Sequence, residues 1–382
     1  FVPVDENYRM DMKILREMIL YESAEHPILA VVGVVGSTEE SSVDEIDQIL
    51  AIREELKKKK NMGFHIHVDA AYGGYVRSLF INEKGDFMTR EQLAEQLKLF
   101  GIIGDKKERK GVTWPHKEVF RAYAAIPEVD TITVDPHKLG YILYPAGGIA
   151  MRDKRMREAI QTFAPYVFPR PKEGEPDALI GAYILEGSKP GAAAAAVWTA
   201  HRIMPLDITG YGKLIGETID GAQALWHGLK HAEPFTLEEN HIKIKIRAYP
   251  VIKPDINIVN YVFNVEGNRD LEKMNRLTAF IADEILGYLP EKGKVILDRK
   301  FIVSSTEFSH EEYKDSPFPF LQKIGFSKAE WDKVQSVKII RSVIMSPYLT
   351  TDYVDDNYVD IFIAYLREEI TENAEQIMKI FA

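Results

Sequence analysis

Two hydrophobic patterns alternate along the first 160 residues. Apolar positions recur at helical spacing within residues 10–19 and 43–60, which predicts helices with one buried side. Short apolar runs, which predict buried strands, lie at residues 28–35, 64–68, 131–134 and 146–152. We expect the last of these strands to be antiparallel to the others. The alternation of helix and strand indicates an α/β fold with a mostly parallel sheet and helices on both faces.

The pattern changes after a long predicted helix at residues 205–232. Alternating strands are expected at 242–246, 257–265 and 338–345, with helices near 269–288 and 355–380. We therefore predict a large domain over 1–232 and a smaller C-terminal α+β domain over 233–382. Two segments interrupt the large domain: a polar insert near 82–125, interpreted as a surface elaboration, and a Pro- and Gly-rich stretch at 162–187, predicted to be a mobile loop.

Composition excludes several classes of function. The 382 residues carry a formal net charge of −10, so no basic surplus favours a nucleic-acid partner. The chain has no cysteine, which removes disulfides, thiolate nucleophiles and cysteine metal sites, and we expect no metal. No apolar run reaches the ~20 residues of a membrane span. Because the chain begins at Phe1 without a methionine, we expect it to be part of a longer protein.

The candidate chemistry lies at the ends of two predicted strands. Asp69 closes one strand and Lys138 follows another. Alone, the aspartate could be a helix cap and the lysine a solvated surface residue. Together they match the needs of pyridoxal 5′-phosphate (PLP), which requires a lysine to bond its aldehyde and a carboxylate to keep its ring nitrogen protonated. Ala71 leaves room for a flat ring, and His137 and Thr131 are candidates for reaching the phosphate.

These segments carry a family resemblance. The runs His67–Gly74 and Asp135–Lys138 resemble the group II PLP-dependent amino-acid decarboxylases, which implies the PLP-dependent transferase fold of type I. The loop Gly36–Glu39 is similar to a Gly-Thr-Thr loop of that family and makes Thr38 a cofactor-binding candidate. The segments 163–166 and 181–189 look most like those of bacterial tyrosine decarboxylases.

The resemblance implies roles for further residues. Tyr166 would donate a proton to Cα after carbon dioxide leaves, and Tyr144 would lie close to the reacting carboxylate. Ser188 would approach the phosphate from a neighbouring subunit, and Ser346 would shape the substrate pocket. The implied reaction converts an aromatic L-amino acid, L-tyrosine above all, to its amine in a cytoplasmic homodimer with shared active sites.

Three alternatives stay open. A glutamate or aspartate decarboxylase would share the same motifs, and an aminotransferase would share the cofactor. The third is an inactive fragment, because the family's ring-stacking histidine and phosphate-binding helix start normally lie upstream of a segment like Pro3–Asp5. The chain thus resembles the C-terminal portion of such a decarboxylase.

Overall fold

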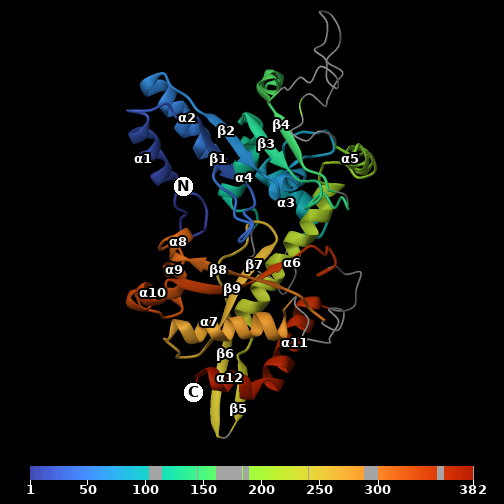
Figure 1. Cartoon of the computed structure of the whole chain (residues 1–382). Helices are drawn as coiled ribbons and strands as arrows, with labels where there is room; N and C mark the ends of the chain where they lie inside the picture. The colour runs from blue at the N-terminus through green and yellow to red at the C-terminus, as the bar shows by residue number, and fades with distance from the viewer. Residues whose placement is uncertain are drawn as a thin grey trace, which may run out of the picture.

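A computed structural model describes residues 1–102, 114–143, 145–160, 183, 189–239, 241–287, 300–350 and 357–381. These residues form two sheets, one in each half of the molecule (Figure 1). A long helix, α6 (Tyr211–His231), runs from the first sheet to the second.

The first sheet has four strands in the order β1-β2-β3-β4. Their bounds are Ala30–Val34, His65–Asp69, Thr131–Val134 and Gly148–Met151. Strands β1, β2 and β3 are parallel, and β4 is antiparallel to β3. All four predicted strands, including the antiparallel one, are confirmed.

Helices pack against this sheet through apolar side chains. Their bounds are α1 Met12–Glu22, α2 Ile46–Lys60, α3 Arg90–Leu99 and α4 Lys117–Ala125. A further helix, α5 (Ala192–Ile203), has no buried residue. Helix α2 lies so close to β1 that a Cβ on Gly33 would come within 2.7 Å of the Ile46 side chain. Four lysines end α2, where positive charge complements the helix dipole. The opposite face is more open in the described part of the chain, with Val32 48% and Ile149 59% exposed.

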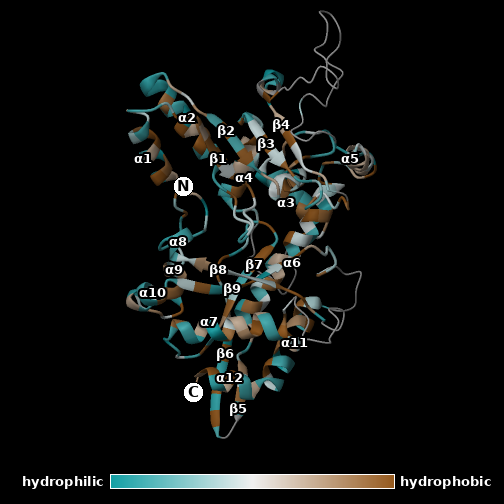
Figure 2. Cartoon of the chain, in the orientation of Figure 1, coloured by the Kyte–Doolittle hydropathy of each residue, from teal (hydrophilic) through white to brown (hydrophobic). Residues whose placement is uncertain are grey.

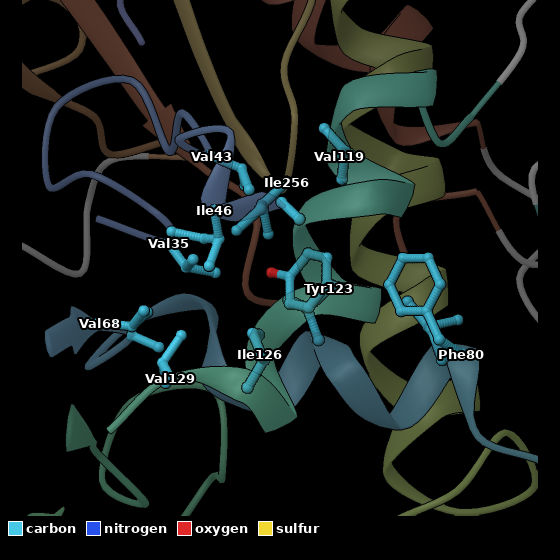
Figure 3. Close-up of a cluster of buried hydrophobic side chains, with 14 of the residues drawn as sticks. Val35, Val43, Ile46, Val68, Phe80, Val119, Tyr123, Ile126, Val129 and Ile256 are labelled. Atoms are coloured by element: carbon cyan, nitrogen blue, oxygen red, sulfur yellow. The ribbon is translucent and has the colours of Figure 1, made fainter. Parts of the chain in front are cut away.

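The segment 82–125 is more than a surface elaboration, and that interpretation was wrong: residues of both α3 and α4 are buried in the core. Val119 and Tyr123 of α4 are fully buried in the core of the first sheet (Figure 3), and Trp114 is 7% exposed. The Tyr123 hydroxyl donates a hydrogen bond to the Gly73 carbonyl at 2.9 Å. The many charged residues of this segment concealed an apolar face that recurs at helical spacing.

The second sheet has five strands in the order β5-β6-β7-β9-β8, and every neighbouring pair is antiparallel. Their bounds are Phe235–Glu239, Ile242–Pro250, Ile258–Val265, Ser336–Val343 and Ser304–Ser309 for β5, β6, β7, β9 and β8. The central strand β7 is buried along its whole length, and apolar residues are prominent along it (Figure 2). The surrounding helices are α7 Leu271–Phe280, α8 His310–Tyr313, α9 Phe318–Lys323, α10 Lys328–Val334, α11 Tyr358–Glu372 and α12 Ala374–Phe381.

One buried ion pair joins segments that are far apart in sequence. Arg9 donates two hydrogen bonds to Asp255, at 2.9 and 2.6 Å, and the backbone N–H of Val43 donates to the same carboxylate at 3.1 Å. His116 lies 3.4 Å from it. Asp255 precedes β7, so this cluster ties the second sheet to the helices and loops of the first.

Candidate active site

Asp69 is the last residue of β2 and is exposed. Its Oδ1 accepts a hydrogen bond from the Ala71 N–H at 3.1 Å, which turns the chain at the end of the strand. Among the described residues no other hydrogen bond to this carboxylate is seen. Its remaining lone pairs are therefore available to a ligand.

Lys138 lies in a turn that follows β3. The turn is closed by the Lys138 N–H, which donates to the Asp135 carbonyl at 3.0 Å. The Lys138 ammonium forms an ion pair with the Asp135 carboxylate at 3.1 Å, and its side chain is 38% exposed. Gly140 follows at a position where a Cβ would come within 2.5 Å of the Pro136 carbonyl oxygen, so the turn has no space for a larger residue there.

His137 is fixed by the strand that follows the turn. Its Nδ1 lies 2.5 Å from the carbonyl oxygen of Ala146. A carbonyl can only accept, so Nδ1 carries the proton. The Nε2 atom lies 3.9 Å from Asp135, and the side chain is exposed.

The loop that contains Thr38 adjoins the same edge of the sheet. Val34 of β1 pairs with Asp69, and Gly36 follows with a φ of +89°. A Cβ on Gly36 would come within 2.9 Å of the Gly73 N, so the loop packs tightly against the turn after Asp69. The Arg341 guanidinium donates to the Thr38 carbonyl.

The carboxyl ends of β1, β2 and β3 thus carry the three sequence-predicted segments. Asp69 pairs with Thr133 of β3, which ends one residue later. Parallel strands bring their carboxyl ends to one edge, where α/β proteins bind ligands. The structure therefore brings together the segments that contain Thr38, Asp69 with Ala71, and His137 with Lys138.

Residues from the second sheet reach this edge as well. The Tyr72 hydroxyl donates to Asn257 Oδ1 at 2.6 Å, and the Tyr141 hydroxyl donates to the Met345 carbonyl at 3.0 Å. Ser346, the predicted pocket residue, directly follows that carbonyl and is exposed. Sequence reasoning gave no role to either tyrosine, although both lie inside or beside the recognised motifs.

Thr131 has a different environment from the one predicted. It begins β3, opposite His67, and its hydroxyl lies 2.8 Å from both His65 Nε2 and His67 Nδ1. Thr133 continues the row, with its hydroxyl 3.2 Å from His67 Nε2. Burial lowers the pKa of His67, which its neighbour Asp69 partly offsets. A phosphate-binding role for Thr131 stays a prediction.

Three predicted residues lie outside the residues that the structure describes: Tyr144, Tyr166 and Ser188. The same holds for most of the loop predicted at 162–187. Their roles stay predictions.

The exposed edge suits a flat cofactor that carries both an aldehyde and a ring nitrogen. Asp69 offers uncommitted lone pairs, and the amine of Lys138 lies 3.1 Å from the Asp135 carboxylate. Two alanines, Ala70 and Ala71, directly follow Asp69. No group of histidine and acidic residues that could hold a metal ion is found in the described ranges.

Sequence comparisons identify the class of protein. Residues 1–94 match the pyridoxal-dependent decarboxylase conserved domain, and residues 221–370 match the tyrosine decarboxylase C-terminal domain. Two parts of the chain thus match models of pyridoxal-dependent and tyrosine decarboxylases, the class that the motifs resemble.

Its similarity to tyrosine decarboxylases of bacteria is more specific. The chain is 44% identical to L-tyrosine decarboxylase of Enterococcus faecium over 97% of its own length and 58% of that protein. It is 43% identical to L-tyrosine decarboxylase of Levilactobacillus brevis over 98% of its length and 57% of that protein. The chain therefore spans less than two thirds of these curated relatives.

Solved structures confirm the fold class. The chain superposes on Oryza sativa TDC with a TM-score of 0.60 at 12% identity, covering 97% of this chain and 57% of that one. For Lactobacillus brevis glutamate decarboxylase the TM-score is 0.56 at 15% identity, covering 97% and 60%. In the described ranges no helix has the length and apolar character needed to cross a bilayer.

Proposed function

We propose that the protein to which this chain belongs is a PLP-dependent decarboxylase that converts L-tyrosine to tyramine and carbon dioxide. The geometry that supports the cofactor is the placement of Asp69 and the Lys138 turn at the carboxyl ends of adjacent parallel strands. The substrate is supported by the similarity to bacterial tyrosine decarboxylases.

Each residue has a defined task in this proposal. PLP, when bound, withdraws the electrons released as the bond between Cα and the carboxylate breaks. Asp69 holds the proton on the ring nitrogen, and Ala71 lies against the ring. Lys138, which is paired with Asp135, would be the residue that holds the cofactor through its aldehyde. His137 and Thr131 would reach the phosphate, and Thr38 would contact the cofactor.

The remaining assignments rest on the family resemblance. We propose that Tyr166 protonates Cα, that Tyr144 and Ser346 contact the substrate, and that Ser188 reaches the phosphate of a neighbouring subunit. The homodimer, the cytoplasmic location and the division at residues 232 and 233 belong to the same proposal. Sedimentation velocity would distinguish a dimer from a monomer.

A product assay tests the reaction and its substrate. The protein is supplied with PLP and either L-tyrosine, L-phenylalanine or L-glutamate, and amine and carbon dioxide are measured. The proposal expects tyramine and carbon dioxide in equal amounts. It also expects strong preference over phenylalanine, because a site that pairs with the phenol hydroxyl leaves polar groups unpaired when it is missing. Faster turnover of glutamate, or a keto acid in place of carbon dioxide, would contradict it.

A further inference from the structure

Four side chains form a continuous hydrogen-bonded row on one face of the first sheet. His65, His67 and Asp69 alternate along β2 and so project from the same face. Thr131 lies between the two imidazoles, at 2.8 Å from each, and Thr133 lies 3.2 Å from the far nitrogen of His67. We call the set His65, Thr131, His67 and Thr133 the imidazole row.

The direction of its hydrogen bonds follows from proton counting. A threonine hydroxyl has one proton, so Thr131 can donate to only one of its two imidazoles. His65 Nδ1 lies 3.9 Å from the carboxylate of Asp130, where a proton on Nδ1 is favoured over a lone pair. With both rings neutral, His65 Nε2 then accepts from Thr131, Thr131 accepts from His67 Nδ1, and His67 Nε2 accepts from Thr133.

This direction keeps donors away from the cofactor carboxylate. Thr133 is paired in register with Asp69, and its only hydroxyl proton is drawn to His67. Asp69 therefore keeps its lone pairs, apart from the bond to the Ala71 N–H. No hydroxyl of the imidazole row then competes with the ring nitrogen of PLP for the Asp69 carboxylate.

We propose that His67 is a positioning residue, held as the Nδ1–H tautomer by Thr131 so that Thr133 does not donate to Asp69. The statement about Asp69 rests on the proposed function, whereas the tautomer is a property of the chain alone. The row also makes the tautomer depend on His65. A His65 ring with its proton on Nε2 would donate to Thr131 and reverse every bond in the row.

The charged and titratable groups on this face of the sheet are few in the described ranges. His67 is flanked on β2 by His65 and Asp69. Asp130, just before β3, lies 3.9 Å from His65, and Asp135 follows the end of β3. The neighbour of His67 on β1 is the apolar Val32. Burial lowers the pKa of His67, so the ring is neutral at about pH 8, where ordinary histidines are also neutral.

Histidine NMR tests the tautomer without any cofactor. The chain is labelled with 15N-histidine, the His67 signals are assigned by their loss in His67→Gln, and the ring nitrogens are measured at about pH 8. We expect the Nδ1–H form. In Thr131→Val the only remaining hydroxyl partner is Thr133, so His67 should change to the Nε2–H form. The matched variant Thr133→Val leaves Thr131 in place and should keep Nδ1–H.

The same two variants test the effect on Asp69. In Thr131→Val the Thr133 proton is released and can donate to Asp69, so PLP should bind about fivefold more weakly, whereas Thr133→Val should bind almost as the parent does. Thr306→Val on β8 controls for the loss of a strand hydroxyl elsewhere.

The outcomes separate the two proposals. An Nε2–H form in the parent, or no change in Thr131→Val, would overturn the assigned direction. Equal PLP affinity for all folded variants would overturn the link to Asp69. If the parent does not take up PLP at all, the proposed function fails, and the tautomer measurement still decides the direction of the row.

Discussion

At the residue scale, Asp69 and Lys138 are held by short-range contacts that leave their functional atoms accessible. Asp69 is anchored by the neighbouring Ala71 amide, and Lys138 by Asp135 three positions earlier. Both partners of each contact stand two or three positions apart, inside one short motif. For this reason the motifs could be recognised in the sequence before the fold was known.

The exposed Asp69 carboxylate gives a direct prediction. Asp69→Asn removes the charge that stabilises a protonated ring nitrogen. A hydrogen bond to a charged group contributes about 1.5–3 kcal/mol, so PLP affinity should fall by about tenfold to a hundredfold. Absorbance titration with PLP measures it. The control Asp283→Asn changes an exposed aspartate of the second half of the chain and should leave affinity unchanged; an equal loss in both variants would refute the role of Asp69.

At the element scale, the loop after β1 depends on close backbone packing. Gly36 combines a positive φ with a Cβ position 2.9 Å from the Gly73 N. Gly85 has nearly the same φ, +87°, but its Cβ would meet nothing within 4 Å. A substitution at Gly85 therefore meets only backbone strain, whereas one at Gly36 meets backbone strain and a steric clash.

Alanine at each glycine measures the two effects. Gly85→Ala should lower the free energy of unfolding by about 1 kcal/mol, the cost of a left-handed non-glycine residue. Gly36→Ala should cost about 2–4 kcal/mol, because the clash with Gly73 adds to it. Urea unfolding followed by circular dichroism gives both values. Equal losses would show that the loop does not pack against the turn as the structure indicates.

Element prediction succeeded where apolar runs were long and failed where they were short or polar. The parallel strands and α2 have continuous or periodic apolar residues, and their positions were predicted closely. Strands β5 and β8 were not predicted. Each borders its sheet and contains polar residues such as Thr236 or Ser305, so alternation is weak and only pairing with a neighbour makes it a strand.

At the scale of the whole molecule, the Arg9–Asp255 pair connects residues separated by 246 positions. No pattern in the sequence indicates such a contact. Neither residue belongs to a motif, and the two become neighbours only when the chain has folded. Burial would raise the pKa of Asp255, but His116 and Arg9 outweigh it and hold the pKa below its usual range. The carboxylate is therefore ionised and stabilises the fold.

Removing one partner should be strongly destabilising. Arg9→Met leaves a buried carboxylate without its main counter-charge, which typically costs about 3–5 kcal/mol. The double variant Arg9→Met with Asp255→Asn should recover part of this loss, because no unpaired charge remains. Chemical denaturation of the parent, single and double variants provides the measurement, and a single variant as stable as the parent would contradict the assigned pairing.

The same pair predicts how stability depends on pH. A carboxyl whose folded pKa is lowered contributes stability that is complete above its unfolded pKa, about 3.9, and is lost as the pH falls through the folded value. The buried Asp44 acts in the opposite sense, because burial raises its pKa to about 6, so its ionisation reduces stability as the pH rises through that value. Asp255→Asn should therefore flatten the acid side of the stability profile, measured by denaturation between about pH 3 and 6.

Covalent trapping shows whether Asp69 and Lys138 serve one cofactor. The protein is incubated with PLP, reduced with borohydride, digested and analysed by mass spectrometry, with Lys138→Ala and the exposed Lys84→Ala treated in parallel. We expect the cofactor mass on the peptide that contains Lys138 in the parent protein. The label should be lost in Lys138→Ala, retained in Lys84→Ala and reduced in yield in Asp69→Asn. Labelling spread over several surface lysines, with Lys138 unmodified, would contradict this expectation.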